Sequence, residues 1–271
     1  MEEIKSIRIS ELKDFKNHPF HVQQDIELCA LMKSIEDEGV IVPLLVRPNP
    51  DGEGYEVIAG QRRVRASELA GINTVPAFVL PLDRDRAIIT LVDSNLQREN
   101  ILPSERAFAY KMKSEAMKRQ GFRTDLTSSQ VVTKLRTDDK VAQGFGVGRM
   151  TVQRFIRLTE LIPPILQMVD EGKIALTPAV ELSFLKKDEQ ENLFATMESE
   201  EATPSLSQAQ RMKQLSQSGR LDMDTIFAIM TEEKGNQKEN LENQHKQAEK
   251  ILSEEHNAEA DGGNHHQTFG A

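Results

Sequence analysis

Two adjacent arginines follow a glycine in the segment Gly60-Gln61-Arg62-Arg63. The residues after them have helical spacing, so the segment is predicted to form the first turn of a helix. Backbone N–H groups at a helix N-terminus attract anions, and a guanidinium donates forked hydrogen bonds to phosphate oxygens. This combination favours binding of a phosphorylated ligand. On residue types alone, two solvated surface arginines are an equally good interpretation.

The elements that position this segment are predicted to be a strand, a helix and a second strand, over residues 55–59, 61–69 and 74–79. The first range alternates with the two-residue period of a strand. Gly60 permits a tight turn into the helix because it has no Cβ. The apolar stripe of that helix is predicted to be Val64, Ala66 and Leu69.

A second candidate site lies in residues 138–156, whose spacing fits a helix-turn-helix. Gly146 takes the position of the turn glycine, and Ala142 that of the small residue in the first helix. The apolar core positions then fall on Val141, Phe145, Val147, Val152 and Phe155 or Ile156. The recognition helix is predicted to run from residue 148 or 149 to about 159, with five side chains facing a DNA major groove: Arg149, Met150, Thr151, Gln153 and Arg154.

These side chains are of types that contact DNA. Arginine and glutamine can read guanine and adenine edges through paired hydrogen bonds, whereas Thr151 suits a phosphate. The charge pattern agrees, because residues 105–160 carry twelve basic and six acidic side chains in a chain whose net charge is −9. A local basic stretch predicts a DNA footprint confined to one part of the protein. The alternative is an ordinary helical hairpin with a solvated basic face.

Residues 60–66 resemble the motif G-E-R-R-x-R-A of the ParB/RepB family of partition proteins, with Gln61 in place of the glutamate. Residues 34–47 resemble that family's first box, with Val42 where glutamine is usual. In the family these boxes contact CTP, the first at the base and sugar and the second at the triphosphate. The resemblance therefore implies a CTP-binding N-terminal domain whose ligands include Gly60, Gln61, Arg62 and Arg63.

Residues 94–99 resemble the family's third box, E-N-x-Q-R, which closes on the triphosphate and its metal. Asn95, Gln97 and Arg98 match it and are implied as further nucleotide ligands. Ser94 replaces a glutamate, which removes a candidate ligand or general base for Mg²⁺-assisted cleavage. The implied cofactor is CTP, with or without Mg²⁺, and the sequence leaves a weak CTPase activity open. The catalytic residue stays unknown, with Asp93 or Glu99 as alternatives to the missing glutamate, and the sequence predicts no metal site of the protein's own.

The resemblance, over roughly residues 4–185, implies a sequence-specific DNA-binding partition protein of a plasmid or other mobile element. Its implied partners are double-stranded DNA, a second copy in a homodimer and a separate ParA-like ATPase, with nucleotide closing the N-terminal domains into a clamp. The alternative is a helix-turn-helix transcriptional regulator with a degenerate nucleotide pocket, favoured by the departures at Val42, Gln61 and Ser94. A nuclease is a third interpretation, which no dense carboxylate or histidine cluster supports.

The expected fold class is α+β, with a small mixed ParB/sulfiredoxin-like N-terminal domain, an all-α helix-turn-helix domain and a disordered acidic tail. The expected boundaries are 1–102, 103–186, 187–233 for additional C-terminal helices, and 234–271 for the tail. The tail is expected because residues 221–261 carry eleven acidic and four basic side chains, and few apolar ones beyond 232.

Other helices are predicted over 25–38, 83–96, 104–120, 128–135, 188–199, 205–218 and 222–231, with two more beginning at Pro163 and Pro178. In the first of these, the inner face is assigned to Ile26, Cys29, Leu31 or Met32, and Ile35. Ser104 is expected to cap the 104–120 helix and Gly121 to end it. Thr177 is expected to cap the helix that begins at Pro178.

The single cysteine, Cys29, excludes an internal disulfide and a cysteine-rich metal site. The N-terminus has no apolar signal region, and no run of eighteen apolar residues occurs in the sequence. We therefore expect a cytoplasmic protein, associated with the nucleoid or a plasmid, without a membrane partner.

Overall fold

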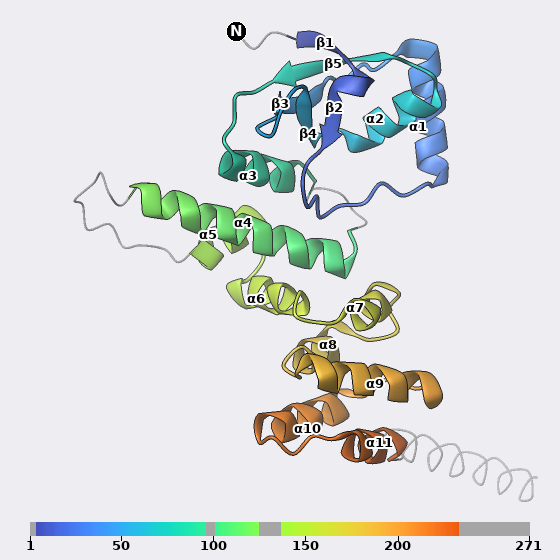
Figure 1. The fold of residues 1–271 in the computed structure, drawn as a ribbon, viewed down its shortest axis with the longest axis vertical. Helices are drawn as coiled ribbons and strands as arrows, with labels where there is room; N and C mark the ends of the chain where they lie inside the picture. Colours follow the sequence, from blue (N-terminus) through green and yellow to red (C-terminus); the bar gives the residue numbers. More distant parts are fainter. Residues whose placement is uncertain (1–3, 96–100, 125–136, 233–271) are drawn as a thin grey trace, which may run out of the picture.

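The computed structural model describes residues 4–95, 101–124 and 137–232 (Figure 1). The fold is α+β: a mixed sheet domain, a long helix and a stack of shorter helices follow one another along the longest axis (Figure 1). Gln97, Arg98, the helix expected over 128–135 and the tail expected over 234–271 lie outside the described residues.

The sheet has five strands in the order β1-β5-β3-β4-β2. Their bounds are β1 Ile4–Arg8, β2 Leu12–Asp14, β3 Leu44–Pro48, β4 Tyr55–Ala59 and β5 Thr74–Val79, and a 3-10 turn η1, Ile9–Glu11, joins the first two. The β1–β5 and β3–β4 pairs are antiparallel. The β2–β4 and β3–β5 pairs are parallel. The strands predicted over 55–59 and 74–79 are confirmed.

Three helices accompany the sheet: α1 Ile26–Glu38, α2 Gln61–Leu69 and α3 Arg84–Asn95. The bounds predicted for α2 are confirmed, but its stripe is partly wrong, because Leu69 is 48% exposed while Ala66 is fully buried. The inner face predicted for α1 is also partly wrong: Ile35 is buried as predicted and Leu31 and Met32 pack beside it, but Ile26 and Cys29 do not belong to this face. Leu28 and Ile35 pack against Ala66 of α2, whereas Ile26 is 88% exposed and Cys29 is exposed.

The long helix α4, Pro103–Thr124, lies between the sheet domain and the helical stack (Figure 1). Gly121 does not end it, because the helix continues through this residue, and one glycine costs only about 1 kcal/mol relative to alanine. Ser104 is not its N-cap either. It lies inside the first turn, where its backbone N–H and hydroxyl both donate to the Asp170 carboxylate at 2.8 and 2.5 Å.

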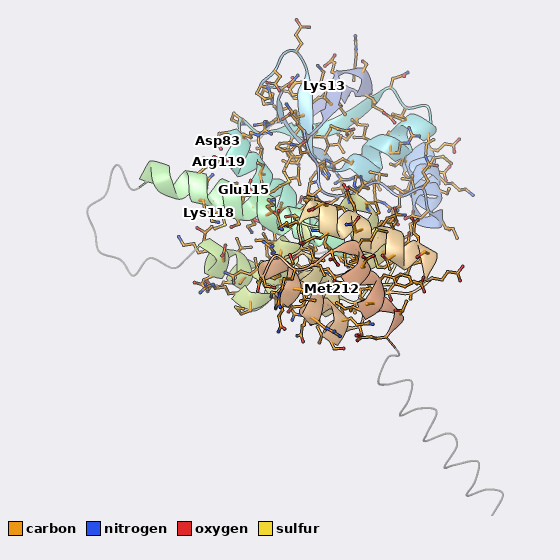
Figure 2. The ribbon with its side chains drawn as sticks, turned by 60° about the horizontal axis from the view of Figure 1, so that its bottom comes forward. Lys13, Asp83, Glu115, Lys118, Arg119 and Met212 are labelled. Atoms are coloured by element: carbon orange, nitrogen blue, oxygen red, sulfur yellow. The ribbon has the colours of Figure 1, made fainter. Side chains whose placement is uncertain are left out.

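One face of α4 packs on α3 through small side chains. Ala109 and Ala116 are fully buried there, against a cluster that includes Ile88 and Leu91 of α3. Charged pairs flank this apolar strip: Arg119 of α4 bonds Asp85 of α3 at 2.8 Å and lies beside Glu115 (Figure 2). The small residues let the two helices approach closely, and the ion pair holds their register.

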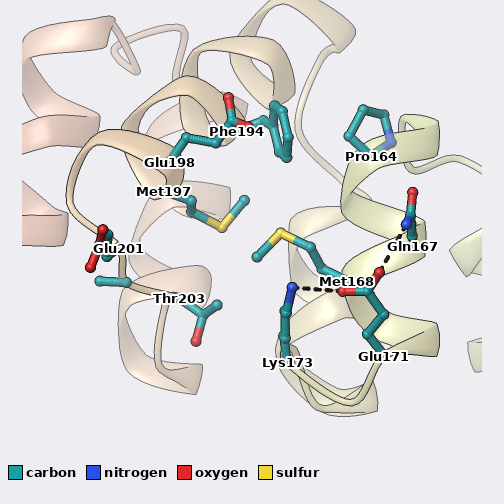
Figure 3. Close-up of a pocket in the computed structure, with 11 residues that line it drawn as sticks. Pro164, Gln167, Met168, Glu171, Lys173, Phe194, Met197, Glu198, Glu201 and Thr203 are labelled. Carbon is teal, nitrogen blue, oxygen red and sulfur yellow. Dashed lines mark hydrogen bonds and ion pairs between the residues drawn. The ribbon is translucent and has the colours of Figure 1, made fainter.

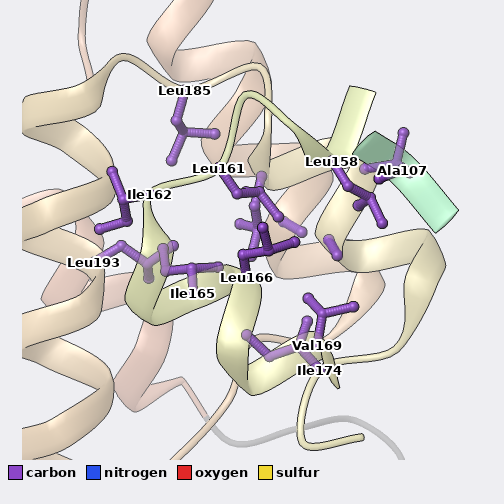
Figure 4. Packing of buried hydrophobic residues seen from close by; sticks show 14 of the residues in the cluster. Ala107, Leu158, Leu161, Ile162, Ile165, Leu166, Val169, Ile174, Leu185 and Leu193 are labelled. Carbon is purple, nitrogen blue, oxygen red and sulfur yellow. The ribbon is translucent and has the colours of Figure 1, made fainter. Parts of the chain in front are cut away.

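The helical stack comprises α5 Thr137–Gly144, α6 Arg149–Leu158, α7 Pro163–Asp170, α8 Leu176–Leu182, α9 Lys187–Ser199, α10 Leu206–Gln217 and α11 Met223–Thr231. Its hydrophobic core extends from Ala107 of α4 to Met230 of α11 (Figure 4 shows its middle part). This core therefore runs across the boundary expected at residue 186. Helix α8 begins at Leu176, two residues before the predicted start, so Ala175 and not Thr177 is its N-cap.

Candidate nucleotide and DNA sites

The turn between β4 and α2 requires a glycine. Gly60 has a φ of +113°, in the region that side chains with a Cβ rarely adopt. A Cβ at this position would also clash with the Cδ2 atom of Leu44 in β3. The strand can therefore feed directly into the helix, which places the α2 N-terminus at the end of the sheet.

Arg62 lies between the N-termini of two helices. Its guanidinium donates to both carboxylate oxygens of Asp25, at 2.9 and 2.8 Å, and reaches Glu27 at 3.5 Å. Asp25 is also the N-cap of α1, accepting a 2.7 Å bond from the Leu28 N–H. The Arg62 hydrogen bond is the main reason why the pKa of Asp25 is below its usual value. In this arrangement Arg62 joins α1 to α2.

Arg63 has a different environment. Its guanidinium donates to the backbone carbonyls of Val42 and Pro43, the latter at 2.7 Å. Burial lowers the pKa of Arg63, and no carboxylate within the described part of the chain pairs with it. The loop before β3 and the α2 N-terminus are thus joined by a cation that no acidic side chain of the described residues neutralises. The two segments singled out by sequence, 34–47 and 60–66, do meet in space.

Gln61 and Asn95 both bond to backbone in their own neighbourhoods. The buried Gln61 amide donates to the Val57 carbonyl of β4 at 3.0 Å. Asn95, also buried, donates to the Leu91 carbonyl at 2.8 Å, and the Ser94 hydroxyl bonds the same carbonyl at 2.9 Å. Neither side chain is bonded to Arg62 or Arg63 in the described structure, so their assignment as nucleotide ligands stays a prediction.

The helix-turn-helix prediction is confirmed. Helix α5 ends at Gly144, Gly146 has a φ of +63°, and α6 begins at Arg149. The Val147 N–H bonds back to the Ala142 carbonyl at 3.1 Å, which closes the turn. The predicted core positions in the two helices are buried, namely Val141, Ala142, Val152 and Phe155.

The predicted reading face of α6 is only partly free. Met150 is 67% exposed. Arg149 lies 3.9 Å from the carboxylate of Asp139, and Gln153 donates to Asp138 at 3.2 Å, so both lean towards α5. Thr151, like them, is partly exposed and is at the same end of α6.

Arg154 reaches the other neighbour of this helix. It donates to the hydroxyl of Thr177 in α8 at 2.6 Å. These contacts with α5 and α8 could not be predicted from the sequence of α6, because the partner residues lie 10 to 23 positions away. Asp25 was also missed as the partner of Arg62, although its place directly before α1 is a recognisable N-cap signal.

A groove with a volume of about 810 Å³ lies between α7 and α9 (Figure 3). Met168, Met197 and Phe194 form its apolar floor (Figure 3). On its rim, Glu171 is paired with Lys173 at 2.7 Å and with Gln167 at 2.8 Å. The groove lacks an unpaired cation cluster and so differs in chemistry from a phosphate site.

No helix within residues 4–95, 101–124 and 137–232 is both long and apolar enough to cross a membrane. The same residues hold no group of three or more histidine, cysteine or acidic side chains arranged to bind a metal ion.

Comparison with known proteins gives a consistent result. The family model of the ParB N-terminal domain matches residues 1–96, and that of the ParB HTH domain matches residues 128–217. The chain belongs to the ParB family. It is 36% identical, over 178 residues, to the probable chromosome 1-partitioning protein ParB of Deinococcus radiodurans, which covers 65% of this chain and 54% of that protein.

It is also 31% identical, over 175 residues, to the stage 0 sporulation protein J of Bacillus subtilis, covering 65% of this chain and 55% of that one. The chain thus spans about half the length of these ParB relatives. C-terminally truncated ParB from Caulobacter crescentus has been solved with the centromeric parS site (24% identity, TM-score 0.46, covering 78% of this chain and 98% of that one). The same protein has been solved with CTP-gamma-S (28% identity, TM-score 0.34, covering 67% and 92%). At these TM-scores the family assignment rests on the two domain models.

Proposed function

We propose that this chain is a sequence-specific DNA-binding partition protein whose N-terminal domain binds CTP. The observation that carries the nucleotide half is the guanidinium of Arg63, fixed by the Val42 and Pro43 carbonyls without a carboxylate partner among the described residues. A cation held at a helix N-terminus is suited to a triphosphate. Gly60 supports the same assignment, because its missing Cβ lets Leu44 and the Arg63 guanidinium pack against this turn, the guanidinium 3.2 Å from where a Cβ would stand.

The DNA half of the proposal is supported by the helix-turn-helix geometry. Helix α6 offers Arg149, Met150, Thr151, Gln153 and Arg154 along one partly exposed face. A recognition helix of this kind docks in a major groove, where arginine and glutamine discriminate bases. The ParB names of the relatives agree with a role in partition.

The residues that would hold CTP are Gly60, Gln61, Arg62, Arg63, Asn95, Gln97 and Arg98. The basic groups would bind the phosphates, and the Val42 loop would lie towards the base and sugar. Magnesium is commonly bound through one or two carboxylates together with substrate phosphates. Ser94 offers no carboxylate, only a hydroxyl that is bonded to the Leu91 carbonyl, so Mg²⁺ would be held mainly by the phosphates of the nucleotide. A weak CTPase activity accordingly has no assigned catalytic residue here.

Family resemblance further supports a homodimer that closes as a clamp on DNA, assisted by a separate ParA-like ATPase. Light scattering with and without CTP and DNA tests the dimer, and cross-linking between N-terminal domains tests closure. The two relatives named above are a chromosome-partitioning and a sporulation protein, so an origin on a mobile element needs its own test. That test is whether plasmid or transfer genes surround the gene of this protein.

The deciding experiment measures binding of radiolabelled CTP, with ATP, GTP and UTP as competitors, in the presence and absence of palindromic DNA. Arg63→Gln is expected to weaken CTP binding at least about ten-fold, since a charge-assisted phosphate contact contributes about 1.5–3 kcal/mol. Arg65→Gln is the matched control, because the Arg65 side chain is half-buried and already paired with Glu68 at 3.0 Å. Equal effects of the two variants would refute the assigned site.

A second candidate, a helix-turn-helix regulator without nucleotide control, is favoured by one observation. Gln61 and Arg62 are already engaged, by Val57 and by Asp25 respectively. Tight, promoter-local DNA binding without any CTP binding would select this function and exclude the clamp.

A further inference from the structure

A cavity of about 530 Å³ lies where α3, α4 and the turn of the helix-turn-helix meet. Helix α3 contributes Asp93 to its wall, and α4 contributes Arg106, Tyr110 and Lys113. The end of α5 and the turn after it contribute Gly144 and Phe145. Neither residues 60–63 nor Asn95 line it, so the cavity is separate from the described part of the proposed CTP site.

The cavity carries more positive than negative charge. Lys113 is only 6% exposed, and its ammonium pairs with Asp93 and lies 4.2 Å from the centre of the Phe145 ring. Arg106 lies over the Phe155 ring at 5.3 Å and has no carboxylate partner in the described part of the chain. The wall of the cavity therefore has two cations and one carboxylate, which is paired with Lys113 only. In a partly desolvated wall the unpaired charge lowers the stability of the fold unless an anion binds.

The two cations lie on the same side of one helix. Arg106 and Lys113 are seven residues apart on α4, which is close to two full helical turns, so both side chains leave the helix in nearly the same direction. An anion in the cavity could therefore accept charge-assisted hydrogen bonds from both.

Tyr110 lies between the two cations on the same helix. It stacks on Phe145 at 5.2 Å and meets Phe155 edge-on at 5.8 Å, so its ring is fixed. Burial raises the pKa of the Tyr110 phenol, and the Arg106 charge opposes this. The phenol accordingly remains protonated near neutral pH and keeps its O–H donor.

We propose that this cavity binds a phosphorylated anion through Arg106 and Lys113, with Asp93 as the competing internal carboxylate. The anion would take over Lys113 from Asp93. Since Lys113 also contacts Phe145, the bound anion would change the link between α3 and the helix-turn-helix turn. This proposal does not depend on CTP binding at Arg63.

The test is calorimetric titration of the full chain with inorganic pyrophosphate at low ionic strength. Arg106→Gln and Lys113→Gln should each weaken binding at least about ten-fold. Asp93→Asn should strengthen it, because it removes the competing charge. Lys140→Gln is the matched control, since Lys140 is exposed and lines no part of this cavity. Opposite effects of Asp93→Asn and Arg106→Gln cannot come from a general loss of structure, even if Lys113→Gln fails to fold.

The same titration is repeated in an Arg62→Ala, Arg63→Gln background to separate the two sites. Pyrophosphate binding that persists there, and is lost on adding Arg106→Gln, supports the cavity. Binding that disappears with Arg62 and Arg63 would place the anion at the proposed CTP site and overturn this inference. Absence of pyrophosphate binding in the unmodified chain would overturn it as well.

Discussion

Arg62 donates one hydrogen bond to each carboxylate oxygen of Asp25, at 2.9 and 2.8 Å, and so joins the N-termini of α1 and α2. The motif that resembles a triphosphate-binding box thus has one arginine paired internally and the other, Arg63, unpaired by any acidic side chain in the described structure. A nucleotide at this site must either share Arg62 with Asp25 or displace the carboxylate.

Replacing Asp25 by serine is therefore expected to raise CTP affinity several-fold, because Arg62 loses its competing carboxylate. Serine retains a side-chain oxygen able to cap α1, so the helix should remain intact. Equilibrium binding of labelled CTP measures the effect. Glu68→Ser, which removes the carboxylate partner of Arg65 in the same way, should leave CTP affinity unchanged. A decrease for Asp25→Ser with an unchanged circular dichroism spectrum would contradict this view of Arg62.

The Asp25–Arg62 pair should also give the protein a pH-dependent component of stability. The pKa of Asp25 is below its ordinary value of 3.8, chiefly through the Arg62 hydrogen bond. A lowered folded-state pKa stabilises the fold above the unfolded-state pKa, and this contribution is lost as pH falls through the folded value. Urea unfolding of the native chain and Asp25→Ser should therefore differ by a constant free energy above about pH 5, and the difference should shrink below 3.8. A gap that stays constant into strong acid would count against the pair.

Gly60→Ala is expected to destabilise the sheet domain by about 2 kcal/mol or more, because a positive φ and a clash with Leu44 act together. Gly71→Ala is the control, since Gly71 has a φ of +72° but nothing within 4 Å of an added Cβ. It should lose only the conformational part, about 1 kcal/mol. Chemical unfolding measures both free energies. Equal losses would mean that Leu44 moves aside without cost.

Two neighbours on α6 should separate DNA contact from stability. Met150 is 67% exposed, whereas Val152 is fully buried in the core. Met150→Ala should change the free energy of unfolding by less than about 0.5 kcal/mol yet weaken binding to the cognate site. Val152→Ala should lower stability by about 1–3 kcal/mol through the cavity it leaves. Thermal unfolding and DNA titration of both variants are the measurements, and full DNA affinity in Met150→Ala would remove this residue from the interface.

Local patterns were sufficient to predict α2 and the helix-turn-helix. In α2 the turn glycine and the helical spacing coincide, and around Gly146 the core positions, the small residue and the turn all agree. The faces of helices were harder, because they depend on partners distant in sequence. Ile26 is exposed because α1 turns Leu28 and Ile35 towards α2 instead.

Side-chain pairing was the least predictable property of the site. The partner of Arg62 lies 37 residues earlier in the chain, and the carbonyls bonded to Arg63 lie about twenty residues before it. Residue types indicate that a guanidinium can bind an oxyanion. Only the folded structure determines whether that guanidinium is already paired with a carboxylate of the protein.

Helix α4 belongs to two hydrophobic clusters at once. Ala109 and Ala116 pack with α3, while Ala107 and Tyr110 belong to the core of the helical stack. Losing either neighbour would leave one side of this helix in water, so each half of the protein helps to keep the other folded. The sheet domain and the DNA-binding helices are therefore expected to unfold cooperatively. A destabilising substitution in one of them should also lower the thermal unfolding midpoint of the other.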